Sequence, residues 1–118
     1  MAAAKDRTTV ASHFTKSAPA VRATYKAILD AARAIGPVRE EAKKTSIHLV
    51  RSSAFAGVAT QKEALILTLK AERRISNGRV RKAEQTSKNR WHMEVRLAAP
   101  DEVDAEVHDW IQRAYDLA

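Results

Sequence analysis

The chain has 118 residues, 45% hydrophobic and 30% charged, which is the length and composition of one ordinary globular domain. Three glycines and three prolines argue against collagen-like, linker and disordered classes, and the absence of cysteine excludes disulfide scaffolds, thiol nucleophiles and cysteine-ligated metals. No apolar run approaches the roughly 18 residues of a membrane span, and Lys5, Asp6 and Arg7 interrupt any signal-peptide stretch. We therefore expect a cytoplasmic protein with no membrane partner.

Charge is distributed unevenly along the chain, whose formal net charge is +7. Residues 37–99 contain 14 Lys and Arg against 6 Asp and Glu, whereas residues 100–118 contain 1 against 6. A basic body with one acidic element can hold a polyanion on one side of the fold. The alternative interpretation involves no ligand: the charges keep the protein soluble, and the acidic C-terminal segment forms ion pairs with the basic middle segment.

The N-terminal third predicts an arm followed by a helix. Residues 1–16 lack apolar periodicity and are expected to form a loosely ordered arm, with Val10 and Phe14 as candidates to dock it, whereas residues 17–118 are expected to form a single domain. Ser17 is a candidate helix cap. The following apolar positions recur at helical spacing until Gly36–Pro37 stops the pattern: Val21, Tyr25, Ile28, Leu29, Ala32 and Ile35.

In the middle of the chain the apolar period changes from 3.6 to 2, which is typical of strands. Five or six short strands are predicted over 38–43, 46–51, 54–60, 64–71, 80–85 and 90–98. The charged first strand suits a sheet edge, whereas residues 64–71 are apolar on both sides and suit the centre. Gly57 predicts a bulge or a close backbone approach, and Asn77–Gly78 predicts a turn over 73–79.

The last segment predicts a second helix, with Pro100 in its first turn followed by acidic residues. Its apolar stripe ends at Leu117, and Trp91 and Trp110 fit the stripes of their elements, so both are assigned to the core. Short connections favour antiparallel pairing. The sequence thus predicts a two-layer α+β fold: an antiparallel five- or six-stranded sheet with an N-terminal and a C-terminal helix packed on one face.

The opposite face of this sheet is expected to be open and polar. Strand alternation places on it Ser46, His48, Ile66, Thr68, Lys70, His92, Glu94 and Arg96, with Arg81 or Lys82 joining them according to the register. This face is the natural place for a binding site, although an antiparallel sheet commonly has one ordinary solvated face.

Residues 70–90 form the most unusual segment, with eight Lys and Arg against Glu72 and Glu84. Such a cluster can contact phosphates, although the scarcity of aromatic residues does not favour base stacking. Together with the open face, this segment gives nine candidate ligand-binding residues: Lys44, Ser46, His48, Lys70, Arg79, Arg81, Arg90, His92 and Arg96.

The catalytic and phosphate-binding motifs that this sequence partly matches are incomplete. His92–Met93–Glu94 has the spacing of a zinc deaminase but lacks its cysteines, and Lys43–Ser46 lacks the glycines of a phosphate loop. His48 and His92 could share a metal only if their strands were neighbours. No catalytic residue, metal ligand or cofactor is predicted.

Several short motifs together resemble a known family: Lys43-Lys44-Thr45-Ser46-Ile47-His48-Leu49, Phe55-Ala56-Gly57, Asn89-Arg90-Trp91-His92 and Pro100-Asp101-Glu102-Val103-Asp104. With His13–Phe14 and Gly36–Pro37, the chain is similar over residues 8–118 to the domain of unknown function numbered 5655. The resemblance implies a single α+β domain, found in small bacterial proteins and at the C-terminus of chains labelled predicted transport proteins. It brings no catalytic residues.

Three functions are therefore weighed. The first is a non-catalytic module that binds an anionic ligand or nucleic-acid backbone through the basic turn and the polar sheet face. The second is a protein-interaction domain that forms a homodimer through an edge strand or the sheet face. The third is a small enzyme that uses His48 and His92 with Lys70 or Arg96, and it requires those side chains to converge.

Overall fold

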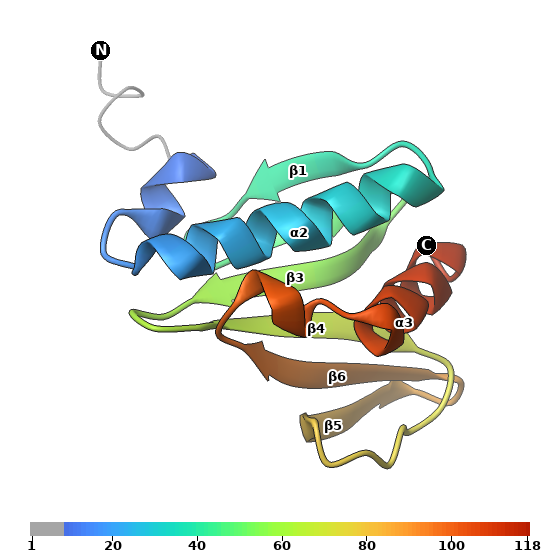
Figure 1. The fold of residues 1–118 in the computed structure, drawn as a ribbon. Coiled ribbons are helices and arrows are strands. Elements are labelled where there is room, and N and C mark those ends of the chain that lie inside the picture. Colours follow the sequence, from blue (N-terminus) through green and yellow to red (C-terminus); the bar gives the residue numbers. More distant parts are fainter. Residues whose placement is uncertain (1–8) are drawn as a thin grey trace.

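The computed structural model describes residues 9–118, so residues 1–8 of the predicted N-terminal arm lie outside the described residues. One layer is a six-stranded antiparallel sheet. The other layer consists of two helices on one face of that sheet, α2 (Pro19–Ile35) and α3 (Ala105–Asp116) (Figure 1). The predicted α+β architecture is confirmed.

The strands follow one another in the order β1-β2-β3-β4-β6-β5 across the sheet. Their bounds are β1 Arg39–Ala42, β2 Ile47–Val50, β3 Ala54–Thr60, β4 Leu65–Ala71, β5 Val80–Ser87 and β6 Arg90–Leu97. The charged first strand lies at an edge and the apolar β4 lies inside the sheet, both as predicted. The only departure from a simple meander is β5, which pairs with β6 at the far edge and leaves β6 beside β4.

The strand register puts the large apolar side chains on the helix-covered face. Leu65, Leu67 and Leu69 of β4 lie opposite Leu97, Val95 and Met93 of β6, and all six are at most 1% exposed. Because side chains alternate across a strand, the residues between them point to the other face. The core therefore lies between the two helices and the strands β2, β3, β4 and β6.

The N-cap of helix α2 lies one residue after the serine that was expected to cap it. Its N-cap is Ala18, and no side chain caps it, so the prediction that Ser17 caps this helix is wrong. The Ser17 hydroxyl donates instead to the Gln61 carbonyl at 2.7 Å, and the Ala18 N–H donates to the Lys62 carbonyl at 2.7 Å. These bonds fasten the start of α2 to the loop between β3 and β4.

Tyr25 links α2 to the edge strand β1. Its hydroxyl donates to the Glu40 carboxylate at 2.5 Å, and burial together with this bond raises the pKa of Tyr25 well above its ordinary value. The hydroxyl is therefore a proton donor at any physiological pH.

Helix α3 also starts later than expected. Pro100 opens a separate 3-10 helix, η2 (Pro100–Glu102), and α3 begins only at Ala105, so the prediction of one continuous helix from Pro100 is wrong. The cause is Asp104, whose carboxylate accepts from the Val107 N–H at 3.2 Å and caps α3.

The described part of the predicted arm contains the 3-10 helix η1 (Ala11–Phe14), whose Phe14 is buried against the core. The His13 Nε2–H donates to the Lys43 carbonyl at 2.8 Å, and the Thr60 hydroxyl donates to the His13 carbonyl at 2.6 Å. Residues 9–16 are thus attached to both the β1–β2 turn and β3.

Two further expectations have different outcomes. Trp110 is 6% exposed, as predicted for the core, but Trp91 is only partly buried because it lies at the hairpin end of β6, beside the edge strand β5. The bulge in this part of the sheet falls between Leu49 and Val50 rather than at Gly57.

Within residues 9–118, no helix has the length and apolar character needed to cross a membrane.

Candidate functional site

The open face of the sheet gathers the polar side chains that alternation predicts for it. Along one row, Gly57 of β3 is paired with His48 of β2 and with Thr68 of β4, which is in turn paired with Glu94 of β6. In the next row Lys70 lies opposite His92. These pairings bring residues from four strands onto one surface.

A hollow of about 500 Å³ opens in this surface above β3. Its floor includes Ala54, Gly57 and Ala59, whose side chains are a methyl group or a hydrogen. Since the strands on either side carry longer side chains, the floor is lower than its rim. The rim is polar and consists of Ser46, His48, Thr68, Lys70 and His92.

Lys70 supplies the only ammonium among the residues that line this hollow. Its Nζ donates to the Ser53 hydroxyl at 3.0 Å, which ties β4 to the loop between β2 and β3. An ammonium carries three N–H donors, so two remain for a ligand. No carboxylate lies within 4 Å of this group among residues 9–118.

The two histidines lie on opposite sides of the hollow. β3 and β4 separate β2 from β6, and neighbouring strands are about 4.8 Å apart, so the backbones that carry His48 and His92 are roughly 14 Å apart. This spacing suits the two ends of an extended ligand better than a single reacting atom. Within residues 9–118, no three His, Asp or Glu side chains are grouped to hold a metal ion.

Of the nine predicted binding residues, four line this hollow: Ser46, His48, Lys70 and His92. Arg96 and Arg81 belong to the same open face but lie outside the hollow, Arg96 opposite Ile66 and Arg81 with its Nε 3.9 Å from Glu94. Lys44 is exposed in the turn between β1 and β2. Arg90 is at the β5–β6 hairpin, where it donates to the Asn89 carbonyl at 2.8 Å.

Arg79 is bonded to the start of α3 and does not face the hollow. Its guanidinium donates to the carboxylates of Asp104 and Glu106, at 3.0 Å each, and to the Glu102 carbonyl at 2.8 Å. The Arg79 bond, followed by the Val107 N–H, holds the pKa of Asp104 below its ordinary value. Two carboxylates thus neutralise Arg79, one of the nine candidates, and its bonds hold the β4–β5 loop to the start of α3.

The sequence reasoning missed the floor of the hollow and Ser53. Part of the signal was present, because Gly57 and Ala59 are two residues apart in a predicted strand and alternation puts both on one side. Ala54 joins them only because of the bulge between β2 and β3. Small residues leave space only if their neighbours are larger, and the neighbours were unknown until the register of β2, β3 and β4 was fixed.

Comparison with known proteins identifies a family and nothing further. Searches of curated proteins and of solved structures each give no match. The model of the family described as domain of unknown function (DUF5655) matches residues 10–118, nearly the whole chain. The chain belongs to the DUF5655 family.

Proposed function

We propose that this domain is a non-catalytic binding module that holds a phosphate-bearing ligand in the hollow above β3. The observation that carries the proposal is the rim itself. Three strands and the β1–β2 turn supply an ammonium, two hydroxyls and two imidazoles around the hollow. The floor residues have side chains too small to fill the space between these groups. Lysine, serine, threonine and histidine are donors to phosphate oxygens.

The distribution of charge supports an anion on this side of the sheet. The acidic C-terminal residues belong to η2 and α3, which lie on the helix-covered face (Figure 1). The open face carries five cations, Arg39, Lys70, Arg81, Lys82 and Arg96, against three carboxylates, Glu41, Glu84 and Glu94. This excess of cations, with the C-terminal carboxylates in the other layer, favours approach of an anion to the open face.

The phosphate can come from a nucleic-acid backbone or from a phosphorylated small molecule. The roughly 14 Å between the histidine strands fits a ligand with more than one phosphate or an extended chain. Backbone binding depends steeply on salt because bound counterions are released, whereas a single phosphate shows a shallow dependence.

The test combines two titrations of the whole chain. Fluorescence anisotropy with labelled single-stranded DNA, duplex DNA and RNA, at several salt concentrations, measures backbone binding. NMR titration with inorganic phosphate and pyrophosphate measures small-anion binding, and amide shifts at residues 46–48, 57 and 68–70 are expected. Absence of binding by every one of these probes at low salt contradicts the proposal.

Two variants locate the site. Lys70→Gln removes the ammonium and is expected to weaken binding by about tenfold, because hydrogen bonds to charged groups contribute on the order of 1.5 kcal/mol or more. Gly57→Val fills the floor and is expected to abolish small-anion binding. Lys62→Gln, an equal charge change in an exposed loop, is the matched control. If Lys62→Gln weakens binding as much as Lys70→Gln, the hollow is not the site.

The other two hypotheses stay predictions. The edge strand β5, which a homodimer could use, carries Arg81, Lys82 and Glu84 and has two register shifts, and both features oppose pairing with a second copy. An enzyme needs His48 and His92 to converge, and their strands are not neighbours. The bacterial origin and cytoplasmic location also stay predictions.

A further inference from the structure

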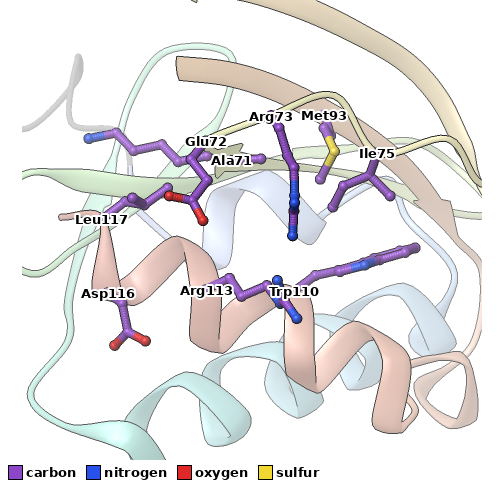
Figure 2. Close-up of a pocket in the computed structure, with 10 residues that line it drawn as sticks. Ala71, Glu72, Arg73, Ile75, Met93, Trp110, Arg113, Asp116 and Leu117 are labelled. Carbon is purple, nitrogen blue, oxygen red and sulfur yellow. The ribbon is translucent and has the colours of Figure 1, made fainter. Parts of the chain in front are cut away.

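A second pocket, of about 190 Å³, lies between α3 and the loop that joins β4 to β5. Figure 2 shows Trp110 and Arg113 on the helix below the pocket and Arg73 and Ile75 on the loop above it. Five apolar side chains line it: Ala71, Ile75, Met93, Trp110 and Leu117. An apolar cavity of roughly 150 Å³ is enough to hold benzene, so this pocket has room for one ring.

The charged lining consists of two guanidinium groups, Arg73 and Arg113, and two carboxylates, Glu72 and Asp116. Lys70 also borders the pocket, but its ammonium donates to the Ser53 hydroxyl and belongs to the open face. In Figure 2 the Arg73 side chain extends from the loop toward α3, whereas the Asp116 carboxylate points away from the loop. Glu72 points toward α3 at the end near Leu117.

Both arginines have donors to spare. Arg113 uses its Nε to donate to Asp109 at 2.8 Å, and its two terminal nitrogens have no hydrogen-bond partner within residues 9–118. Arg73 has neither a hydrogen bond nor an ion pair in that part of the chain, in contrast to Arg79, which has four bonds. Two guanidinium groups in one pocket repel each other, and the Glu72 carboxylate of the same pocket forms no ion pair with either of them within residues 9–118.

We infer that this pocket binds a small aromatic carboxylate, with its ring against Trp110 and Met93 and its carboxylate between Arg73 and Arg113. Trp110 and Met93 are 6% and 1% exposed, so the ring would meet walls that are already formed. A thioether beside a ring is a favourable contact, and an arginine binds a carboxylate through two parallel N–H groups. The inference is independent of the proposed function, which rests on different residues except for Lys70.

The test compares three probes that share one ring and differ in charge: benzoate, benzyl alcohol and benzylamine. NMR titration of the whole chain is expected to shift the Trp110 indole N–H and the Met93 methyl with benzoate. Benzoate is expected to bind at least about fivefold more tightly than benzyl alcohol, since a partly exposed charge pair contributes on the order of 1 kcal/mol. Equal binding of benzyl alcohol, tighter binding of benzylamine, or no shift with benzoate would overturn the inference.

Two single variants and a control complete the test. Arg73→Gln and Arg113→Gln are each expected to weaken benzoate binding by roughly three- to fivefold and to leave benzyl alcohol binding unchanged. Arg74→Gln, the neighbour of Arg73 that does not line the pocket, is the matched control and is expected to bind benzoate as the unmodified chain does. Unchanged benzoate affinity in both single variants contradicts the inference, as does a benzoate-induced shift confined to His48 and Gly57.

Discussion

The two faces of this sheet are built from the same strands and have opposite contents. On the helix-covered face β4 presents Leu65, Leu67 and Leu69, all fully buried. On the open face it presents Thr68 and Lys70 beside the small residues of β3, and space remains there. This difference indicates that burial of apolar side chains on the helix-covered face stabilises the domain. The open face contributes less to stability, so a hollow can remain there without unfolding the protein.

Gly36 and Gly57 differ in the same way, because one lies in a packed region and the other beside open space. Gly36, just after α2, lies against the ring of Tyr115 on α3, with no room for a larger residue. Gly57 lies on the open face, where an added Cβ would be 3.8 Å from the His48 ring, an ordinary contact. One glycine is therefore required for packing, and the other is required only for the shape of the hollow.

The largest expected effect is on the covered face. Leu67→Ala should lower the free energy of unfolding by about 3 kcal/mol, because it removes a fully buried side chain and leaves a cavity. Thr68→Ala, the next residue on the open face, should lower it by less than about 1 kcal/mol. Urea denaturation measures both, and similar losses in the two variants would contradict the assignment of faces.

Gly36→Ala should be the next most costly change, with a loss of about 2 kcal/mol, because a methyl group there would collide with the Tyr115 hydroxyl. That hydroxyl also donates to the Pro37 carbonyl at 3.0 Å. In the double variant Gly36→Ala/Tyr115→Phe the oxygen is absent, so the loss should be smaller than the sum of the two single losses. Strict additivity in thermal or urea unfolding would show that the two sites do not meet.

Loss of Arg79 should have a smaller, pH-dependent effect at the start of α3. Arg79→Gln is expected to cost about 1 kcal/mol at pH 7, discounted because the partners are partly exposed. The Arg79 bond lowers the pKa of Asp104 in the folded protein, so its stabilisation is fully present above the unfolded pKa of about 3.9 and is lost as pH falls through the folded pKa.

The measurement is urea denaturation at pH 7 and at pH 3 for both chains. The unmodified chain should lose more stability on acidification than Arg79→Gln does. Glu41, whose pKa the Arg39 bond and then the Lys43 bond also lower, contributes in the same direction in both chains and cancels in the comparison. Equal losses on acidification would contradict a structural role for Arg79.

Gly57→Ala should have the smallest effect on stability and the opposite sign. The residue has no positive φ, so alanine adopts its backbone conformation without strain, and fewer unfolded conformations should raise the stability by about 0.5 kcal/mol. The same variant should weaken phosphate binding in the hollow. A destabilised Gly57→Ala chain in urea denaturation would mean that the open face is packed more tightly there than the structure indicates.

Much of this architecture could be predicted because its signals are local. The period of the apolar residues located α2, and the strand over 54–60 has the predicted bounds. Two wrong predictions concern helix starts. Ser17 bonds to the distant Gln61 instead of capping α2, and Asp104 caps α3 after a separate 3-10 turn at Pro100. Arg79 stays a candidate ligand-binding residue, although in the structure it bonds to Asp104 and Glu106.

By itself, the sequence determined the two amphipathic helices, five or six strands between them and most of the side chains on each face of the sheet, because periodicity depends only on the local backbone. Only the tertiary structure decided that β6 lies beside β4, that Gly57 lies between His48 and Thr68, and that Arg73 and Arg113 share a pocket. The physical reason is that a hollow depends on the side chains of neighbouring strands, and strand order and register are set when distant segments pack together.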